Sequence, residues 1–413
     1  MILKKEKKEK KNYKINKFLF IYFILTIIIG AVLTIFILQS VAFNQIKSKG
    51  LDLLSKGGRY EYLYLPNIAI KAIKSNFYKL EKINLEIKFD NLLILENIRN
   101  NSIKEGSLPG SNFNSKVNFK LIYNNKKYPG EIRLKGDRKA HFEDKEKSSY
   151  KIELDKENYI FGASKFSLQK PRLRNYVHEW IYHQMAKDFD IIKLKYEFLE
   201  LSINGENKGL YVLEEGFGKE LIERNKRRNG PIFGLNEELG GDSHNPVFEI
   251  YNKKYWAKDE NKALVENASQ KLDDFFNEKV DLEDIFDIEK WAAYFAIVDM
   301  TSTYHGAFLK SVKLYYNPIN GLFEPIPYDG HRLKPNYHKY NLNYDDRILI
   351  DIIDNPINLD EIAGLLWLKK MFYKKNGELN ILFYNSYVKN LNLISSNEYT
   401  EKFLDQNLKK IKE

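Results

Sequence analysis

The pattern of apolar and polar positions changes character along the chain. Between residues 83 and 168, short segments alternate apolar and polar side chains, as half-buried β-strands do. From residue 173 onward, apolar residues recur mostly at helical spacing. The predicted strands are 83–89, 117–123, 130–136 and 149–154, and the predicted helices are 173–188, 257–277, 283–301 and the region after about 350. This order of strands first and helices afterwards predicts an α+β fold with two lobes.

Two β-hairpins are also predicted. Residues 196–203 and 209–215 flank an Asn-Gly turn, which is a strong hairpin signal. Residues 312–316 and 322–328 flank the turn NPING in the mainly helical half of the chain. The second hairpin is therefore a strand pair inserted among helices.

Residues 18–38 contain no charged side chain. A helix of that length spans about 30 Å, the thickness of the hydrocarbon core of a bilayer. A cleaved signal peptide is the alternative, but its apolar core is usually only ~7–15 residues long. Eight lysines and two glutamates precede the segment, and lysine-rich flanks stay in the cytoplasm. We expect a single-pass membrane protein with a cytoplasmic N-terminus and an extracytoplasmic domain at the cell envelope.

The predicted organisation has four parts. They are a basic tail at 1–17, a transmembrane helix at 18–40, a connector at 41–80, and a domain at 81–413 with an N-lobe at 81–215 and a C-lobe at 216–413.

Charge and cysteine content exclude several classes of protein. The net charge is +10, but the first 17 residues hold +6 of it. A nucleic-acid-binding protein usually carries its positive charge on the folded domain, so no nucleic-acid partner is expected. The absence of cysteine excludes zinc ribbons, disulfide scaffolds and thiol catalysis.

Two aspartates flank the second hairpin. Asp299 ends the apolar run AAYFAIV, and Asp329 follows LFEPIPY and precedes Gly330. Each alone is more simply explained as a cap or an ion-pair partner. Together they match the arrangement in kinases, where one aspartate orients the acceptor hydroxyl and another binds Mg²⁺ between phosphates.

A kinase also requires a cation for the donor phosphates. Lys151 lies on a predicted strand, and Glu179 on the following helix is a candidate ion-pair partner. A lone strand lysine is more often a solvated edge residue. His305 is a further candidate for the catalytic site, although a turn or core histidine is the simpler interpretation. The sequence contains neither a Walker A motif nor G-x-G-x-x-G, and His178 and His183 have the wrong spacing for a zinc protease.

Five segments together resemble the CotH kinase family, which includes spore-coat assembly kinases and many exported or membrane-linked bacterial proteins. The resemblance covers about residues 80–345. The segments are IRLKGDRKAHF (132–142), SYKIEL (149–154), FSLQKPRLRNYVHEW (166–180), NGENKGLYVLEEGF (204–217) and YYNPINGLFEPIPYD (315–329).

The resemblance implies an atypical protein-kinase-like fold, with a β-rich N-lobe and a mainly helical C-lobe that carries the hairpin. It implies ATP with Mg²⁺ or Mn²⁺, and a protein or glycan hydroxyl as acceptor. The implied roles are Lys151 for the nucleotide phosphates, Glu215, Arg133, Gly136 and Arg174 around the nucleotide cleft, Asp299 for catalysis and Asp329 for the metal.

The chain departs from the family pattern at two positions. Ser311 stands where many relatives have a metal-binding Asn, and His331 replaces an acidic residue. A second metal ligand at Ser311 would be weak. The predicted function is a metal-dependent phosphotransferase. The alternatives are an inactive pseudokinase scaffold that binds an envelope partner and a glycan hydrolase using the two aspartates.

Overall fold

The computed structural model describes most of the chain from residue 80 onward. The described residues are 22, 80–108, 115–136, 138–144, 146–155, 157–236, 246–330, 349–354 and 364–412. Apart from Tyr22, they all belong to one compact unit formed by 78–335 and 342–413. The predicted tail, the predicted transmembrane segment apart from Tyr22, nearly all of the connector, and His331 lie outside the described residues.

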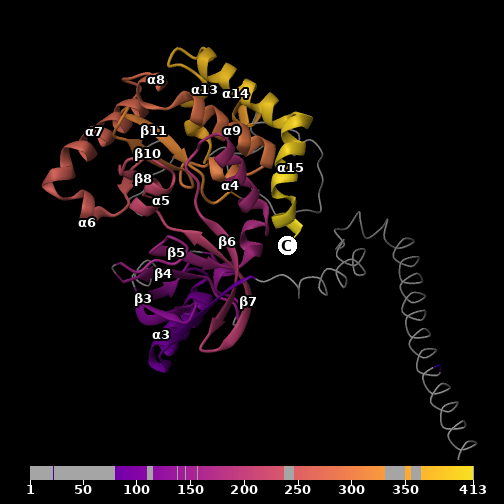
Figure 1. The fold of residues 1–413 in the computed structure, drawn as a ribbon. Helices are drawn as coiled ribbons and strands as arrows, with labels where there is room; N and C mark the ends of the chain where they lie inside the picture. The colour runs from indigo at the N-terminus through magenta and orange to yellow at the C-terminus, as the bar shows by residue number, and fades with distance from the viewer. Residues whose placement is uncertain are drawn as a thin grey trace, which may run out of the picture. The chain divides into compact units, whose positions relative to one another are not determined.

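The first half of this unit is a closed seven-stranded β-barrel with strand order β1-β2-β3-β4-β5-β7-β6 (Figure 1). The strands are β1 (Glu81–Ile87), β2 (Val117–Tyr123), β3 (Lys126–Leu134), β4 (Tyr150–Leu154), β5 (Lys165–Gln169), β6 (Tyr196–Ile203) and β7 (Glu206–Glu215). Alternate side chains such as Leu85, Leu121 and Ile152 point inward and are fully buried. Parallel pairing of β1 with β6 closes the barrel, with Ile83 opposite Leu201.

The second half contains a four-stranded sheet of order β11-β10-β8-β9, with helices around it (Figure 1). Its strands are β8 (Ile232–Leu235), β9 (Phe248–Ile250), β10 (Lys313–Asn317) and β11 (Leu322–Ile326). The described α-helices are α3 (Phe89–Glu105), α4 (His178–Asp188), α5 (Lys219–Arg224), α6 (Lys253–Trp256), α7 (Asp259–Phe276), α8 (Leu282–Ile285), α9 (Ile288–Thr301), α11 (Leu349–Asp354), α13 (Lys369–Phe372), α14 (Ile381–Ser395) and α15 (Asn397–Lys412). Short 3₁₀ segments are η3 (Lys139–His141), η4 (Pro171–Arg174), η6 (Tyr304–Ala307) and η7 (Leu366–Leu368).

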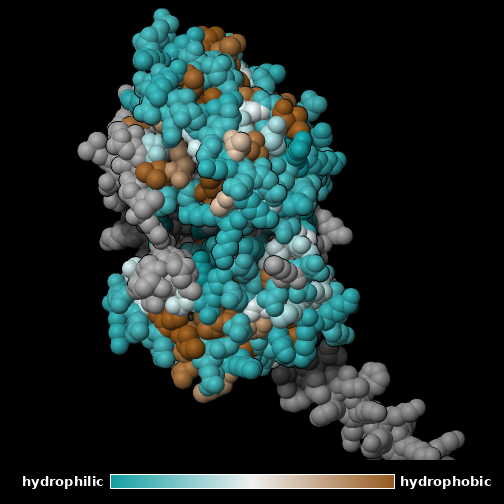
Figure 2. Space-filling view, turned by 90° about the vertical axis from the view of Figure 1, so that its left-hand side faces the viewer, coloured by the Kyte–Doolittle hydropathy of each residue, from teal (hydrophilic) through white to brown (hydrophobic). Residues whose placement is uncertain are grey.

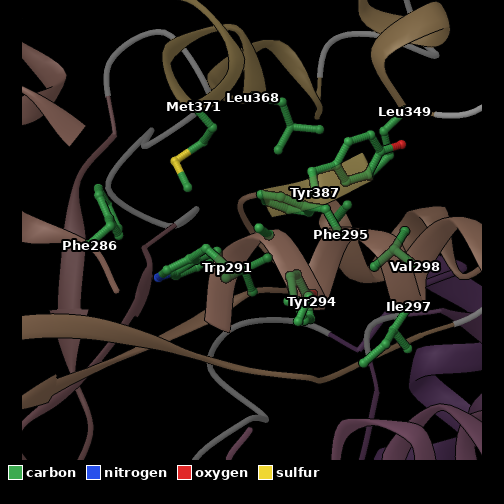
Figure 3. Packing of buried hydrophobic residues seen from close by; sticks show 14 of the residues in the cluster. Phe286, Trp291, Tyr294, Phe295, Ile297, Val298, Leu349, Leu368, Met371 and Tyr387 are labelled. Carbon is green, nitrogen blue, oxygen red and sulfur yellow. The ribbon is translucent and has the colours of Figure 1, made fainter. Parts of the chain in front are cut away.

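Helix α9 is the centre of the second half. Ten of its 14 residues are buried, because other elements cover it on nearly every side. Trp291, Tyr294 and Phe295 pack there with Tyr387 of α14 (Figure 3). A helix that is apolar on all faces must lie inside the fold, and the uncharged run AAYFAIV is such a helix.

The predicted two-lobed fold with an inserted hairpin is wrong. The β-rich part, predicted as the N-lobe, is a closed barrel. The hairpin β10–β11 belongs to a larger sheet, where Leu314 pairs with Phe233. Both differences come from strand pairs far apart in sequence, which alternation of apolar residues does not reveal. The predicted helix 173–188 also begins later, at His178, because Pro171–Arg174 forms a 3₁₀ turn.

The predicted membrane localisation is also wrong for the part of the chain that the structure describes. None of the described helices has both the length and the apolar character needed to cross a bilayer. The 18-residue helix α7 illustrates why, since charged side chains occur throughout it. The face shown in Figure 2 is mostly hydrophilic, with apolar side chains gathered toward the end of the unit that contains α3. Phe89, Leu93 and Ile94 of α3 are exposed.

Candidate active site

Five charged side chains from five different elements meet where the barrel joins the second half of the fold. We name this group the ionic cluster: Lys135 after β3, Arg174 in η4, Glu179 in α4, Glu214 in β7 and Asp329 after β11. The guanidinium of Arg174 lies between two carboxylates, with Nε 2.9 Å from Glu179 Oε2 and Nη2 2.6 Å from Asp329 Oδ1. Lys135 pairs with Glu214, and its Nζ donates a hydrogen bond to Gln169 Oε1 at 3.0 Å.

The backbone places Asp329 under constraint. Its φ is +56°, in the left-handed region that non-glycine residues seldom adopt. Gly330 follows, and a Cβ there would lie only 2.5 Å from the ring of Tyr182. The Gly330 amide donates to Glu179 Oε1 at 3.3 Å. Only glycine allows the backbone at residue 330 to lie this close to α4. This close contact places the preceding residue, Asp329, next to Arg174.

His305 contacts the other oxygen of Asp329. Its Nδ1 lies 3.3 Å from Asp329 Oδ2 and 3.1 Å from the hydroxyl of Ser311. The ring stacks on Phe308 at a centroid distance of 5.1 Å, which fixes its orientation. The structure therefore brings three predicted site residues together, with His305 between Ser311 and Asp329.

Burial controls the protonation of the cluster. Desolvation raises the pKa of Glu179 to about 8, although Arg174 opposes that shift. Burial alone would lower the pKa of Arg174, but the charges of Asp329 and Glu179 raise it well above its usual value. The cluster holds two cations and three carboxylates. Arg174 is the cation that contacts two of these carboxylates, those of Glu179 and Asp329.

A cleft of about 320 Å³ lies beside the cluster, and Glu214 and Tyr328 form part of its lining. Arg133 and Lys151, which face each other across strands β3 and β4, lie on its barrel side. Among the described residues, Lys151 has no ion-pair partner. Lys151 is an exposed residue of β4, between the buried Tyr150 and Ile152. Partial desolvation and the neighbouring charges of Arg133 and Lys135 lower its pKa to about 8. Neighbouring Lys116 and Lys165 are instead neutralised by glutamates of the barrel surface.

Aromatic rings form another part of the cleft lining. Phe217 lies 4.6 Å from Tyr251 and 5.1 Å from Tyr328, measured between ring centroids. Lys135 of the ionic cluster lies 6.0 Å from the ring of Tyr328. The cleft therefore offers aromatic rings and an unpaired lysine in one lining, which also includes Tyr328, the residue before Asp329. A planar base with attached phosphates requires both kinds of surface.

The predicted ion pair between Lys151 and Glu179 is wrong. Glu179 pairs with Arg174, while Lys151 lies in the cleft. Glu215 also lines the cleft, but its Oε2 accepts the Lys195 amide at 2.8 Å and contacts Arg224. Gly136 has a φ of +97°, and the ring of His141 occupies the space that a Cβ would need. Gly136 therefore shapes the turn after β3.

Asp299 does not join the ionic cluster. Its carboxylate accepts hydrogen bonds from the Leu349 amide at 2.9 Å and from the hydroxyl of Tyr387. Burial raises its pKa to about 8, while these two donors lower it in part. Helix α9 ends at Thr301, two residues after Asp299, and the turn that follows leads to His305 in η6. The two predicted aspartates therefore do not share one hydrogen-bonded site.

Sequence reasoning missed Lys135 and Glu214. Lys135 directly precedes the candidate residue Gly136. Glu214 directly precedes Glu215, which was the predicted cleft residue of this adjacent pair. Strand alternation contains a usable signal, because only one of two adjacent glutamates on β7 can face the cluster. The pattern alone does not say which one.

Among the described residues, no group of three or more His, Asp or Glu side chains could hold a metal ion. Mg²⁺ is commonly bound through one or two carboxylates together with substrate phosphates. Asp329 fits that mode, since it is a single carboxylate beside a cationic cleft. The residues therefore fit a cation that binds together with phosphate.

Comparison with known proteins agrees with the resemblance in the sequence. A family model described as CotH kinase protein matches residues 132–364, more than half of the chain. The inner spore coat protein H of Bacillus subtilis (strain 168) is 25% identical over 214 residues. That alignment covers 46% of this chain and 56% of the relative. The chain belongs to the CotH kinase family, and this membership indicates a kinase-related function.

Proposed function

We propose that the chain is a phosphotransferase that moves a phosphoryl group from ATP to a hydroxyl acceptor, either of a protein or of a glycan. The observation that carries the proposal is the cleft, in which the unpaired Lys151 lies close to the cluster that contains Asp329. Membership of the CotH kinase family supports the same reaction class.

The proposed donor site uses both kinds of surface in the cleft. Lys151 and Arg133 bind the phosphates, and Phe217 and Tyr251 contact the base. Lys135 and Arg174 are then the cations nearest to the phosphoryl group that moves. Phosphoryl transfer depends mainly on positioning and on stabilising negative charge, and these cations supply both.

Asp329 is the proposed ligand for Mg²⁺ or Mn²⁺, with Ser311 beside His305 as a weaker oxygen donor. When bound, the cation would neutralise charge on the phosphates. Arg174 and His305 hold the Asp329 carboxylate in place. Asp299 is the proposed acceptor of the proton from the hydroxyl, which is the role that the family resemblance implies for it. Burial raises the pKa of its carboxyl to about 8, so this role requires the ionised form that gains population as pH rises.

The test measures binding of ATP to the purified protein by calorimetry, with and without Mg²⁺ or Mn²⁺, together with transfer of the terminal phosphate. Asp329→Ala should abolish the metal-dependent part of binding. Asp299→Asn should leave binding nearly unchanged and lower turnover by roughly 10²–10⁴-fold. A wild-type protein that binds no nucleotide in either condition would refute the proposal.

A second candidate function is an inactive scaffold that binds a partner. The observation in its favour is that Arg174 and His305 already contact both oxygens of Asp329, so the site is electrostatically satisfied without a metal. A scaffold transfers no phosphate. Neither the Asp329 nor the Asp299 substitution would then alter partner binding.

A further inference from the structure

Tyr387 contacts the proposed proton acceptor from a helix beyond the family match. The match ends at residue 364, whereas Tyr387 lies on α14 and is fully buried. Its hydroxyl donates a hydrogen bond to Asp299 Oδ2, and the Leu349 amide donates to Oδ1 at 2.9 Å. Figure 3 shows Tyr387 lying over α9 close to Leu349 and Phe295. Two donors from two elements therefore fix both oxygens of this carboxylate.

We propose that Tyr387 is a positioning residue for Asp299, holding its carboxylate in the orientation and ionisation state that proton transfer requires. This inference rests on the proposed function, in which Asp299 accepts a proton. Each carboxylate oxygen has two lone-pair sites. An oxygen that accepts one hydrogen bond can therefore still accept the proton of an acceptor hydroxyl.

The acceptor oxygen forms a bond to the terminal phosphorus of ATP while its proton moves to Asp299. The bond between that phosphorus and the oxygen bridging to the β-phosphate breaks, and ADP leaves with the electron pair. Tyr387 keeps its own proton throughout. It acts by stabilising the ionised carboxylate before the transfer, since a hydrogen bond donated to a charged group favours that charged form.

Other titratable groups around Asp299 are few among the described residues. Asp351 of α11 raises the pKa of Asp299 by charge repulsion, and it also raises that of Tyr387. Burial and the charge of Asp299 are the main causes that raise the pKa of Tyr387, and Tyr304 of η6 adds to them. Neither group donates a proton to Asp299. Tyr387 is therefore the side chain whose removal changes the charge balance at this carboxylate most directly.

The chain offers a matched control on the next helix. Tyr399 of α15 donates a hydrogen bond from its hydroxyl to Asp188 Oδ2 at 2.9 Å, at the end of α4. Tyr399→Phe removes the same kind of bond as Tyr387→Phe, but it does so away from Asp299. Any effect common to both variants reflects stability, and an effect of Tyr387→Phe alone reflects Asp299.

The experiment uses the full chain with ATP and Mg²⁺, and measures phosphate transferred to water or to the protein itself between pH 6 and 9.5. Tyr387→Phe should leave the KM for ATP unchanged. It should move the acidic limb of the kcat profile upward by about one pH unit, with a roughly ten-fold fall at pH 7. Tyr399→Phe should keep the wild-type profile. A second readout is the free energy of unfolding against pH, in which Tyr387→Phe should move the upper end of the Asp299 titration to higher pH.

Two negative outcomes are distinguishable. If Asp299→Asn lowers turnover but the Tyr387→Phe profile coincides with those of the wild type and Tyr399→Phe, the positioning role is refuted and the proposed function stands. If the wild type transfers no phosphate, or if Asp299→Asn is as active as the wild type, the proposed role of Asp299 fails. The positioning role fails with it.

Discussion

Arg174 Nη2 lies 2.6 Å from Asp329 Oδ1, although these residues belong to different halves of the fold. The same guanidinium pairs through Nε with Glu179, whose side chain is fully buried. Arg174 thus compensates two carboxylates that would otherwise repel each other in a site of low dielectric. This relationship links the 3₁₀ turn after β5 to the loop after β11.

Arg174→Ala should destabilise the protein by roughly 3–5 kcal/mol, because it leaves buried carboxylates without a cation. The measurement is unfolding in guanidinium chloride. Arg172→Ala is the matched control in the same turn, since Arg172 is exposed and lies 3.9 Å from Glu143. That control should change stability by less than about 0.5 kcal/mol. Equal losses for both variants would show that Arg174 does not hold the cluster together.

The raised pKa of Asp299 predicts a pH dependence of stability. Between its usual pKa and about 8, the folded state holds a proton that the unfolded state releases. The contribution of the protonated Asp299 carboxyl to stability is therefore fully present at low pH and is lost as pH rises toward 8. The free energy of unfolding should fall over this range by up to about 1.4 kcal/mol per pH unit. Asp299→Asn should remove this part of the slope. Glu179 titrates in the same direction, so only the difference between wild type and variant is diagnostic.

Gly330→Ala should cost roughly 1–3 kcal/mol, because the new methyl group would lie 2.5 Å from the ring of Tyr182. The clash also displaces the neighbouring Asp329, so metal-dependent nucleotide binding should weaken. Combining the substitution with Tyr182→Leu, which removes most of the ring, should recover part of the binding. If Gly330→Ala changed neither the free energy of unfolding nor nucleotide binding, the close contact between Gly330 and the Tyr182 ring would be contradicted.

Lys151 predicts how nucleotide binding changes with pH. Its pKa is lowered to about 8, so the ammonium loses its charge as pH rises through that value. Affinity for ATP with Mg²⁺ should therefore fall between pH 7 and 9.5 in the wild type. Lys151→Arg should remain charged and should bind with little change over that range. Calorimetric titration checks this, with the exposed Lys120→Ala as a control. If the affinity of Lys151→Arg for ATP fell with pH as it does in the wild type, a group other than Lys151 would cause the pH dependence.

Local pattern was sufficient for individual elements but not for their assembly. The alternation in 117–123 predicted β2 with its observed bounds, because a strand with one buried face has a period of two whatever its partner is. Closure of the barrel depends on parallel pairing of β1 with β6, which are separated by more than a hundred residues. No local period carries that information, so the sequence pattern predicted a β-rich lobe without its closure into a barrel.

The sequence by itself determined the family and the identity of most candidate side chains. The motif segments are linear, and the roles of Asp329, His305 and Lys151 could be proposed from them. Tertiary structure alone decided which charges meet. It paired Glu179 with Arg174 instead of Lys151, chose Glu214 over Glu215 for Lys135, and placed Asp299 against Tyr387. The physical reason is that ion pairing in a buried site depends on three-dimensional distance and on side-chain direction, and both are set by contacts between elements distant in the chain.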